Sequence, residues 1–141
     1  MNPRWWIGLG GGIGALLRYA LMNLFPEKPL PYGIFIINIL GSFFIAVIMT
    51  GTQEFGWPPE RLRIFLTVGV LGGFTTFSTF ALGTYLLIQQ AHFMAAYTYS
   101  IGSLFFGLTA AWSGIIFVRT INRWLESRAV QDDRRRDEAN E

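Results

Sequence analysis

The sequence is dominated by four long runs of apolar residues, which are separated by short polar or proline-containing segments. The runs cover approximately residues 5–25, 32–52, 64–90 and 93–118. A helix needs about 20 mostly apolar residues to cross the hydrocarbon core of a bilayer. Each run is long enough for one crossing, so the pattern predicts an all-α membrane protein with four transmembrane helices.

The segments between the runs contain residues that end helices or lie in water. Residues 26–31 contain three prolines, and residues 54–63 contain two more; proline cannot continue a helix. Beyond residue 126 the chain is polar and highly charged. We therefore predict one transmembrane domain over residues 1–125 and a polar, disordered tail over residues 126–141.

The distribution of charge strengthens the membrane interpretation. Residues 64–118 contain no Asp, Glu, Lys or Arg, and only 14% of the chain is charged, against roughly one quarter in soluble domains. A soluble chain of this length could not bury so much apolar surface around one core. The net charge of +2 and the mixed signs of the tail argue against nucleic-acid binding. Without cysteine, a nucleophile–base pair or a metal-ligand cluster, the sequence also argues against an enzyme.

Small residues are frequent in the first run, which contains Gly8, Gly10, Gly11, Gly12 and Gly14. In lipid, small residues let helices approach one another closely, so we interpret most of these glycines as packing residues. Four short helices enclose little volume by themselves. We therefore expect an oligomer in which a pathway lies partly at a subunit interface.

The third run contains a segment that is poorly suited to a continuous helix. From residue 72 it reads Gly-Gly-Phe-Thr-Thr-Phe-Ser-Thr-Phe, and glycine and threonine have low helix propensity. A break in mid-membrane is stable only where protein, water or an ion satisfies the freed backbone groups, and broken helices often present such groups to ions. The alternative is an unbroken helix whose hydroxyls bond to the preceding turn. For the whole cluster we favour a third helix that is broken mid-membrane.

The residues after this glycine pair combine aromatic rings with hydroxyls. Phe77 and Phe80 are three positions apart and share a helix face, with Ser78 and Thr79 beside them. Ring edges are electropositive, so ring edges and hydroxyl donors together are suited to line an anion path. Two phenylalanines taken alone would more often be core or lipid contacts.

Three other polar residues lie within apolar runs. Asn38 either lines a polar path or hydrogen-bonds to another helix. Arg18 either extends to the membrane interface or attracts anions into a vestibule. Tyr99 either joins the polar path or anchors its helix at the interface. These residues alone leave the alternatives open.

Three stretches together resemble the signature of a known family. Residues 11–19, 38–43 and 72–80 are similar, in order and in position on the runs, to the signature stretches of the fluoride channels called Fluc or CrcB. The resemblance covers about residues 3–120. It implies a fluoride-selective channel that exports fluoride passively across the bacterial cytoplasmic (inner) membrane. It further implies an antiparallel, dual-topology homodimer with two pores.

The resemblance also implies roles for the residues of the third run. Phe77 and Phe80 would be the pore phenylalanines, and Ser78 and Thr79 would belong to the polar track. Because fluoride is small and tightly hydrated, a narrow pore must replace its lost water with several strong donors.

The same resemblance implies roles for residues outside the aromatic segment. Asn38 would be the pore amide, Tyr99 a pore hydroxyl and Arg18 the vestibule arginine. The carbonyl groups of Gly72 and Thr75 from both subunits would hold a structural sodium ion at the dimer centre.

The positions of the arginines are uneven for a protein that inserts in both orientations. One side of the predicted spans is flanked by six arginines, against Lys28 and Arg18 on the other side. The six are Arg4, Arg61, Arg63, Arg119, Arg123 and Arg128. The positive-inside rule then predicts both termini in the cytoplasm. Either some chains insert inverted and form a homodimer, which we favour, or the chain pairs with an oppositely oriented paralogue.

Two other functions fit a small protein of four spans. A proton-coupled multidrug exporter needs a carboxylate inside the membrane, whereas Glu27 and Glu54 are both predicted in loops. A non-transporting assembly subunit would use the polar cluster for packing only. Loss of anion flux on changing Phe80 or Asn38, without loss of the dimer, would argue against that second function.

Overall fold

The computed structural model describes residues 3–25 and 30–140, and every regular element within these ranges is a helix. The long helices are α1 (Pro3–Met22), α2 (Tyr32–Phe55), α5 (Phe77–Gln89) and α6 (Phe93–Asn140). Between α2 and α5 lie α3 (Glu60–Ile64), the π-helix η1 (Phe65–Leu71) and α4 (Gly72–Phe74), which follow one another without a gap. The all-helical prediction is therefore confirmed for the described residues.

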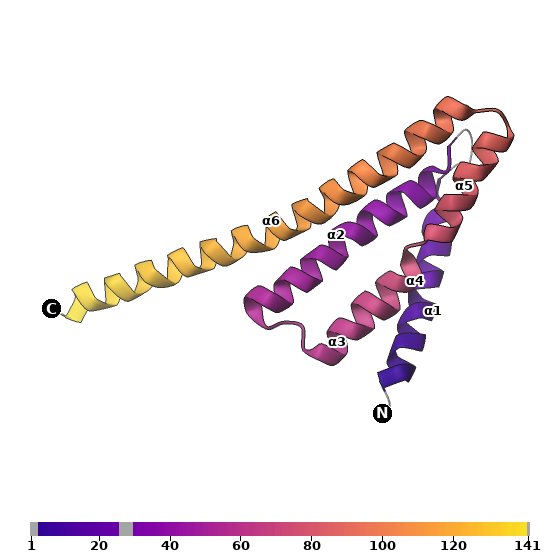
Figure 1. The fold of residues 1–141 in the computed structure, drawn as a ribbon. Helices are drawn as coiled ribbons and strands as arrows, with labels where there is room; N and C mark the ends of the chain where they lie inside the picture. The colour runs from indigo at the N-terminus through magenta and orange to yellow at the C-terminus, as the bar shows by residue number, and fades with distance from the viewer. Residues whose placement is uncertain (1–2, 26–29, 141) are drawn as a thin grey trace.

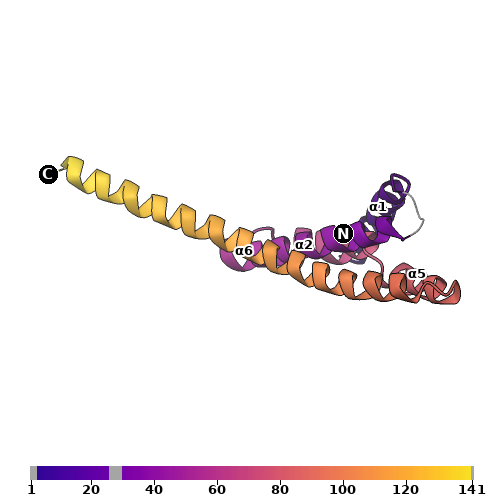
Figure 2. The same cartoon turned by 90° about the horizontal axis from the view of Figure 1, so that it is seen from above.

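The helices form a bundle with one long projecting arm. Helix α6 lies along α2 and continues far beyond it (Figure 1). Helix α1 packs mainly against η1 and α4, and it tilts away from the layer formed by α2 and α6 (Figure 2). Helix α5 packs against the first part of α6. The junction between α4 and α5 consequently lies where α1, α2 and the third helical stretch meet.

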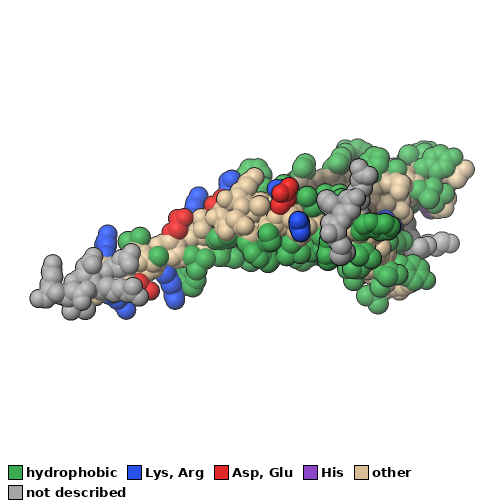
Figure 3. All heavy atoms as spheres, turned by 90° about the horizontal axis from the view of Figure 1, so that it is seen from below, with side chains coloured by type: hydrophobic (Ala, Val, Ile, Leu, Met, Phe, Trp, Pro, Cys, Tyr) green, Lys and Arg blue, Asp and Glu red, His purple; other side chains and the backbone are tan. Residues whose placement is uncertain are grey.

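Three helical stretches of the described chain are long and apolar enough to cross a membrane: Tyr32–Phe55, Glu60–Gln89 and Phe93–Asp132. Helix α1 has 20 residues, but its glycines and Arg18 lower its hydropathy, so a crossing by α1 stays a prediction. On the face seen in Figure 3, hydrophobic side chains cover much of the bundle, while charged ones concentrate on the arm. A bilayer or a second subunit would cover this exposed apolar surface.

Glycines bring α1 directly against the third helical stretch. A Cβ atom on Gly10 would lie 2.9 Å from the Gly69 Cα atom, and one on Gly14 would collide with the backbone carbonyl of Val70. No side chain larger than hydrogen fits at these crossings without moving the backbone. The packing interpretation is thus confirmed for Gly10 and Gly14, whereas a Cβ atom on Gly8, Gly11 or Gly12 would meet open space within this subunit.

Helix α6 continues through the charged segment and ends at Asn140, where the sequence suggested a disordered tail. The segment contains four Arg, three Glu and two Ala, which favour helix, and it extends a helix that the apolar run has already nucleated. Its described side chains beyond residue 126 are exposed. The predicted proline turn falls largely on residues 26–29, which lie outside the described ranges.

Candidate ion pathway at the helix break

The third helical stretch is interrupted at Thr75 and Thr76. Helix α4 ends at Phe74, and both threonines have extended backbones, with φ −77° and ψ 158° at Thr75 and φ −152° and ψ 119° at Thr76. Helix α5 then begins at Phe77. The interruption agrees with the prediction from the Gly-Gly and Thr-Thr pairs, and it lies near the middle of the apolar stretch Glu60–Gln89.

The side chain of Asn38 on α2 satisfies the backbone at the break. Its Nδ2 donates to the Thr76 carbonyl oxygen at 3.1 Å, and its Oδ1 accepts from the Thr76 N–H at 2.9 Å. One amide thus replaces two hydrogen bonds that a continuous helix would have made. The structure shows the interhelical hydrogen bond that was one interpretation of Asn38. One N–H of its amide group is left for another acceptor.

The hydroxyl of Thr76 connects the polar side chains at the start of α5. Its Oγ1 accepts from the Thr79 N–H at 3.2 Å and caps the helix N-terminus. The same oxygen lies 3.2 Å from Ser78 Oγ and 3.0 Å from Thr79 Oγ1. Thr76 is 7% exposed, while Ser78 is exposed and Thr79 half-buried. Three hydroxyls therefore run from the buried break toward the surface.

Arg18 approaches the other side of the break. Its Nη1 donates to the Thr75 carbonyl oxygen at 3.5 Å, so the guanidinium is directed at the break in this subunit. The Thr75 N–H and hydroxyl both donate to the Leu71 carbonyl at 2.9 Å. Because the Thr76 N–H is turned to Asn38, it does not supply the hydrogen bond that a continuing helix would give to the Gly72 carbonyl.

Three aromatic rings form a row beside the hydroxyls. The Phe77 and Phe80 ring centroids are 5.8 Å apart, and those of Phe80 and Tyr99 are 5.3 Å apart. Phe77 is 79% exposed and Tyr99 only 4% exposed, so the row leads from the surface into the chain. Within the described residues, the Tyr99 hydroxyl is buried without a hydrogen-bond partner. A buried hydroxyl of this kind is suited to bind a ligand or a group from a second subunit.

Comparison with known protein families gives a match over most of the chain. Residues 5–115 match the family described as CrcB-like protein, Camphor Resistance (CrcB). The chain belongs to this CrcB family. The matched residues include the break and every candidate residue described above, and they stop before the charged part of α6.

Curated relatives of this CrcB-family chain are named as fluoride channels. The chain is 40% identical over 126 residues to the fluoride-specific ion channel FluC of Novosphingobium aromaticivorans, which covers 86% of this chain and 99% of that protein. It is 40% identical over 121 residues to FluC 2 of Nocardia farcinica, covering 84% and 83%. It is 38% identical over 116 residues to FluC of Geobacter metallireducens, covering 80% and 94%.

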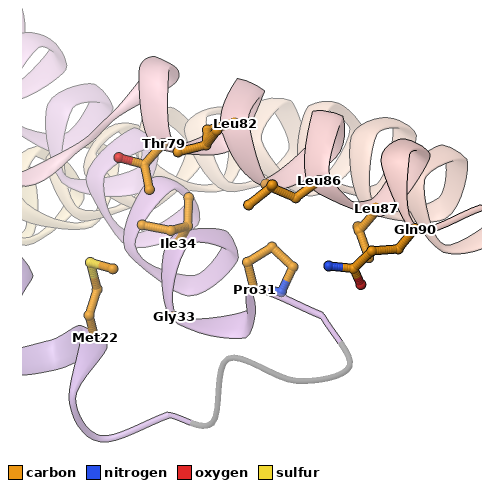
Figure 4. Close-up of a pocket in the computed structure, with 10 residues that line it drawn as sticks. Met22, Pro31, Gly33, Ile34, Thr79, Leu82, Leu86, Leu87 and Gln90 are labelled. Atoms are coloured by element: carbon orange, nitrogen blue, oxygen red, sulfur yellow. The ribbon is translucent and has the colours of Figure 1, made fainter. Parts of the chain in front are cut away.

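A cavity of about 320 Å³ adjoins the break in this CrcB-family chain. It lies between the end of α1, the start of α2 and one face of α5 (Figure 4). Thr79 lines it near the break, Gln90 lies at the far end of α5, and leucines such as Leu82 and Leu86 form the wall between them. Thr79 is therefore the member of the hydroxyl group that faces this cavity.

The structure corrects the prediction that Glu54 lies in a loop. Glu54 is in the last turn of α2, where its Oε1 lies 3.4 Å from Arg119 Nε and its Oε2 accepts from Asn122 Nδ2 at 3.1 Å. The carboxylate joins the end of α2 to α6. The sequence placed Arg119 only among the arginines that flank one side of the spans, and an ion pair between segments so far apart has no local signal.

Most of the predicted site residues are brought together by the fold. Phe77, Ser78, Thr79 and Phe80 share the first turn of α5, with Asn38 and Tyr99 in contact with this region and Arg18 on the other side of the break. Thr76, which holds the centre of this group, was not among the predicted site residues. Its position three residues before Thr79, at the start of a resumed helix, is a typical N-cap signal that could have identified it.

Proposed function

We propose that this chain forms a fluoride-selective channel that lets fluoride leave the cell passively across the bacterial cytoplasmic membrane. The supporting observation is the row of hydroxyls and aromatic rings at a helix break, in a chain whose relatives are named fluoride-specific ion channels. The chain is a multi-pass membrane protein and not an enzyme. The proposal requires no protonatable group inside the membrane spans.

The chemistry of the break suits a small, strongly hydrated anion. Ser78 and Thr79 offer hydroxyl donors, and Phe77 and Phe80 offer electropositive ring edges along the same path. A narrow pore becomes selective when such groups replace the hydration shell of the preferred ion. The exposed Phe77 ring would meet the ion first, and Thr79, which faces the cavity, would follow.

A buried hydroxyl and a half-buried amide are assigned to the inner part of the same path. The Tyr99 hydroxyl has no partner among the described residues and would donate to fluoride. Asn38 would contribute only the amide hydrogen that Thr76 does not use. Arg18, directed at the Thr75 carbonyl, would supply positive charge near the vestibule.

The proposed channel is an antiparallel homodimer of four-helix subunits, with α1 as the fourth span and the break near the membrane centre. Much of the aromatic surface of one subunit is exposed, including Phe77 at 79%, and a second subunit would enclose it. A heterodimer with an oppositely oriented paralogue is the alternative. Purified protein from a strain expressing only this chain distinguishes the two, because the homodimer conducts fluoride without a partner.

A sodium ion is proposed to join the two breaks at the dimer axis. Carbonyl oxygens are hard ligands that suit Na⁺, and the break turns the Thr76 N–H away from Gly72. The Thr75 carbonyl accepts at 3.5 Å from Arg18, a weak bond that the guanidinium can give up. Gly72 and Thr75 of each subunit would thus provide four ligands. The ion would stabilise the dimer and would not take part in conduction.

Fluoride efflux from liposomes containing the purified chain tests the function. The expected result is fast fluoride efflux with little chloride efflux, because chloride is larger and forms weaker hydrogen bonds with closely spaced hydroxyl donors. Phe80→Ile should reduce fluoride flux by at least about tenfold, whereas Phe105→Ile, on the exposed face of α6, should conduct normally. A folded protein without fluoride efflux would favour the non-transporting assembly subunit.

A further inference from the structure

We propose that Thr76 is a positioning residue that orients the Ser78 and Thr79 hydroxyls toward the ion. This inference rests on the proposed fluoride channel and adds a residue to it. Thr76 is 7% exposed and has its backbone held at both N–H and C=O by Asn38. It is therefore fixed in place and shielded from the path, and it acts through its two neighbours.

The hydroxyl of Thr76 has three hydrogen-bonding neighbours, and the number of protons and lone pairs available to them supports this role. A threonine hydroxyl has one proton and two lone pairs. One lone pair accepts the Thr79 N–H at 3.2 Å, which leaves one proton and one lone pair for two neighbouring hydroxyls, at 3.2 Å and 3.0 Å. When Thr76 donates its proton to one neighbour, that neighbour has its own proton free to point outward.

The arrangement makes one hydroxyl at a time an outward donor. If Thr76 donates to Thr79, the Thr79 hydroxyl donates to the ion, and Ser78 can donate back to Thr76. If Thr76 donates to Ser78 instead, the Ser78 hydroxyl donates to the ion and Thr79 can donate back to Thr76. A rotation of three hydroxyl protons, without movement of heavy atoms, thus transfers the outward donor from the exposed Ser78 to Thr79 at the cavity. Fluoride, as a strong acceptor, would be handed from one to the other.

The Thr76 hydroxyl can be tested by substitutions that keep the size of the side chain. Thr76→Val keeps the shape and loses the hydroxyl, Thr76→Ser keeps the hydroxyl, and Thr67→Val is the matched control. Thr67 Oγ1 donates to the carbonyl of Arg63 in the preceding turn, away from the break. Fluoride efflux should fall at least about tenfold in Thr76→Val and less than about threefold in the other two variants.

The outcomes separate this inference from the proposed function. A parent protein that conducts no fluoride overturns both. A conducting parent with an equally active Thr76→Val overturns only the role of Thr76, as does a Thr76→Ser variant that is as impaired as Thr76→Val. Size-exclusion profiles and unfolding temperatures are recorded for each variant, since a purely structural effect would lower stability and flux together.

A second measurement leaves Thr76 intact, in case Thr76→Val does not fold. Because the hand-over needs both hydroxyls, Ser78→Ala and Thr79→Val should each reduce the fluoride flux on their own. Once one hydroxyl is lost there is no hand-over left for the second to disturb, so the combined loss should be about tenfold smaller than the product of the two single losses. A combined loss equal to that product would show that the two hydroxyls act independently, and would overturn the inference.

Discussion

Replacement of Asn38 by leucine tests whether its side chain holds the helix break open. Leucine has a similar shape but can neither donate to the Thr76 carbonyl nor accept from the Thr76 N–H, bonds that measure 3.1 Å and 2.9 Å in the native chain. Both backbone groups belong to a residue that is only 7% exposed. Water cannot readily replace the lost amide.

The size of the effect follows from these two groups. A buried polar group left unpaired costs about 1–3 kcal/mol, so the two groups together would cost about 2–6 kcal/mol. Closing the break into a continuous helix would recover part of this cost. It would also remove the extended backbone at Thr76 and the cap of α5. We therefore expect Asn38→Leu to lower both the stability of the protein and its fluoride flux.

Thermal unfolding in detergent and fluoride efflux from liposomes should be measured on the same preparation. Asn23→Leu is the matched control, because Asn23 lies exposed just after α1 and should change neither quantity. An unchanged unfolding temperature with lost flux would refute the reasoning, since the amide would then act on the ion and not on the break. Unchanged flux and stability would refute both roles of Asn38.

Two further predictions concern the helix packing and the arm. Gly14→Val should destabilise the protein by about 1–3 kcal/mol or prevent folding, because its side chain would collide with the Val70 carbonyl, while Gly12→Val should be neutral in thermal unfolding. Deletion of residues 129–141, whose described side chains are exposed, should change unfolding by less than about 0.5 kcal/mol and leave fluoride flux intact. Reduced flux in this truncated protein would show that the arm contributes to the channel.

The sequence was most informative where local chemistry decides the structure. The long apolar runs predicted helices, and poor helix formers near Thr75 predicted an interruption. The aromatic and hydroxyl residues of α5 were found because they are adjacent in sequence. Tyr99 was noticed as a hydroxyl within the fourth run, and the family resemblance then favoured a pore role over an interface anchor.

Other features depend on contacts between distant segments and have no local pattern. Asn38 and Thr76 are separated by 38 positions, so apolar periodicity could not identify their pairing. The same holds for the pairing of Glu54 with Arg119. The helical arm was missed for another reason: polar composition alone does not distinguish a disordered tail from the continuation of a long helix.

The contact between Asn38 and Thr76 has a consequence for the order of events during insertion. The partner of the break lies on α2, so the third segment cannot gain this contact while it is alone in lipid. There, two unpaired backbone groups are costly, and an uninterrupted helix is the more stable state. We therefore expect the break to form when α2 docks. It is a product of tertiary assembly, and a third segment synthesised without α2 should be a straight helix that has not yet acquired an ion pathway.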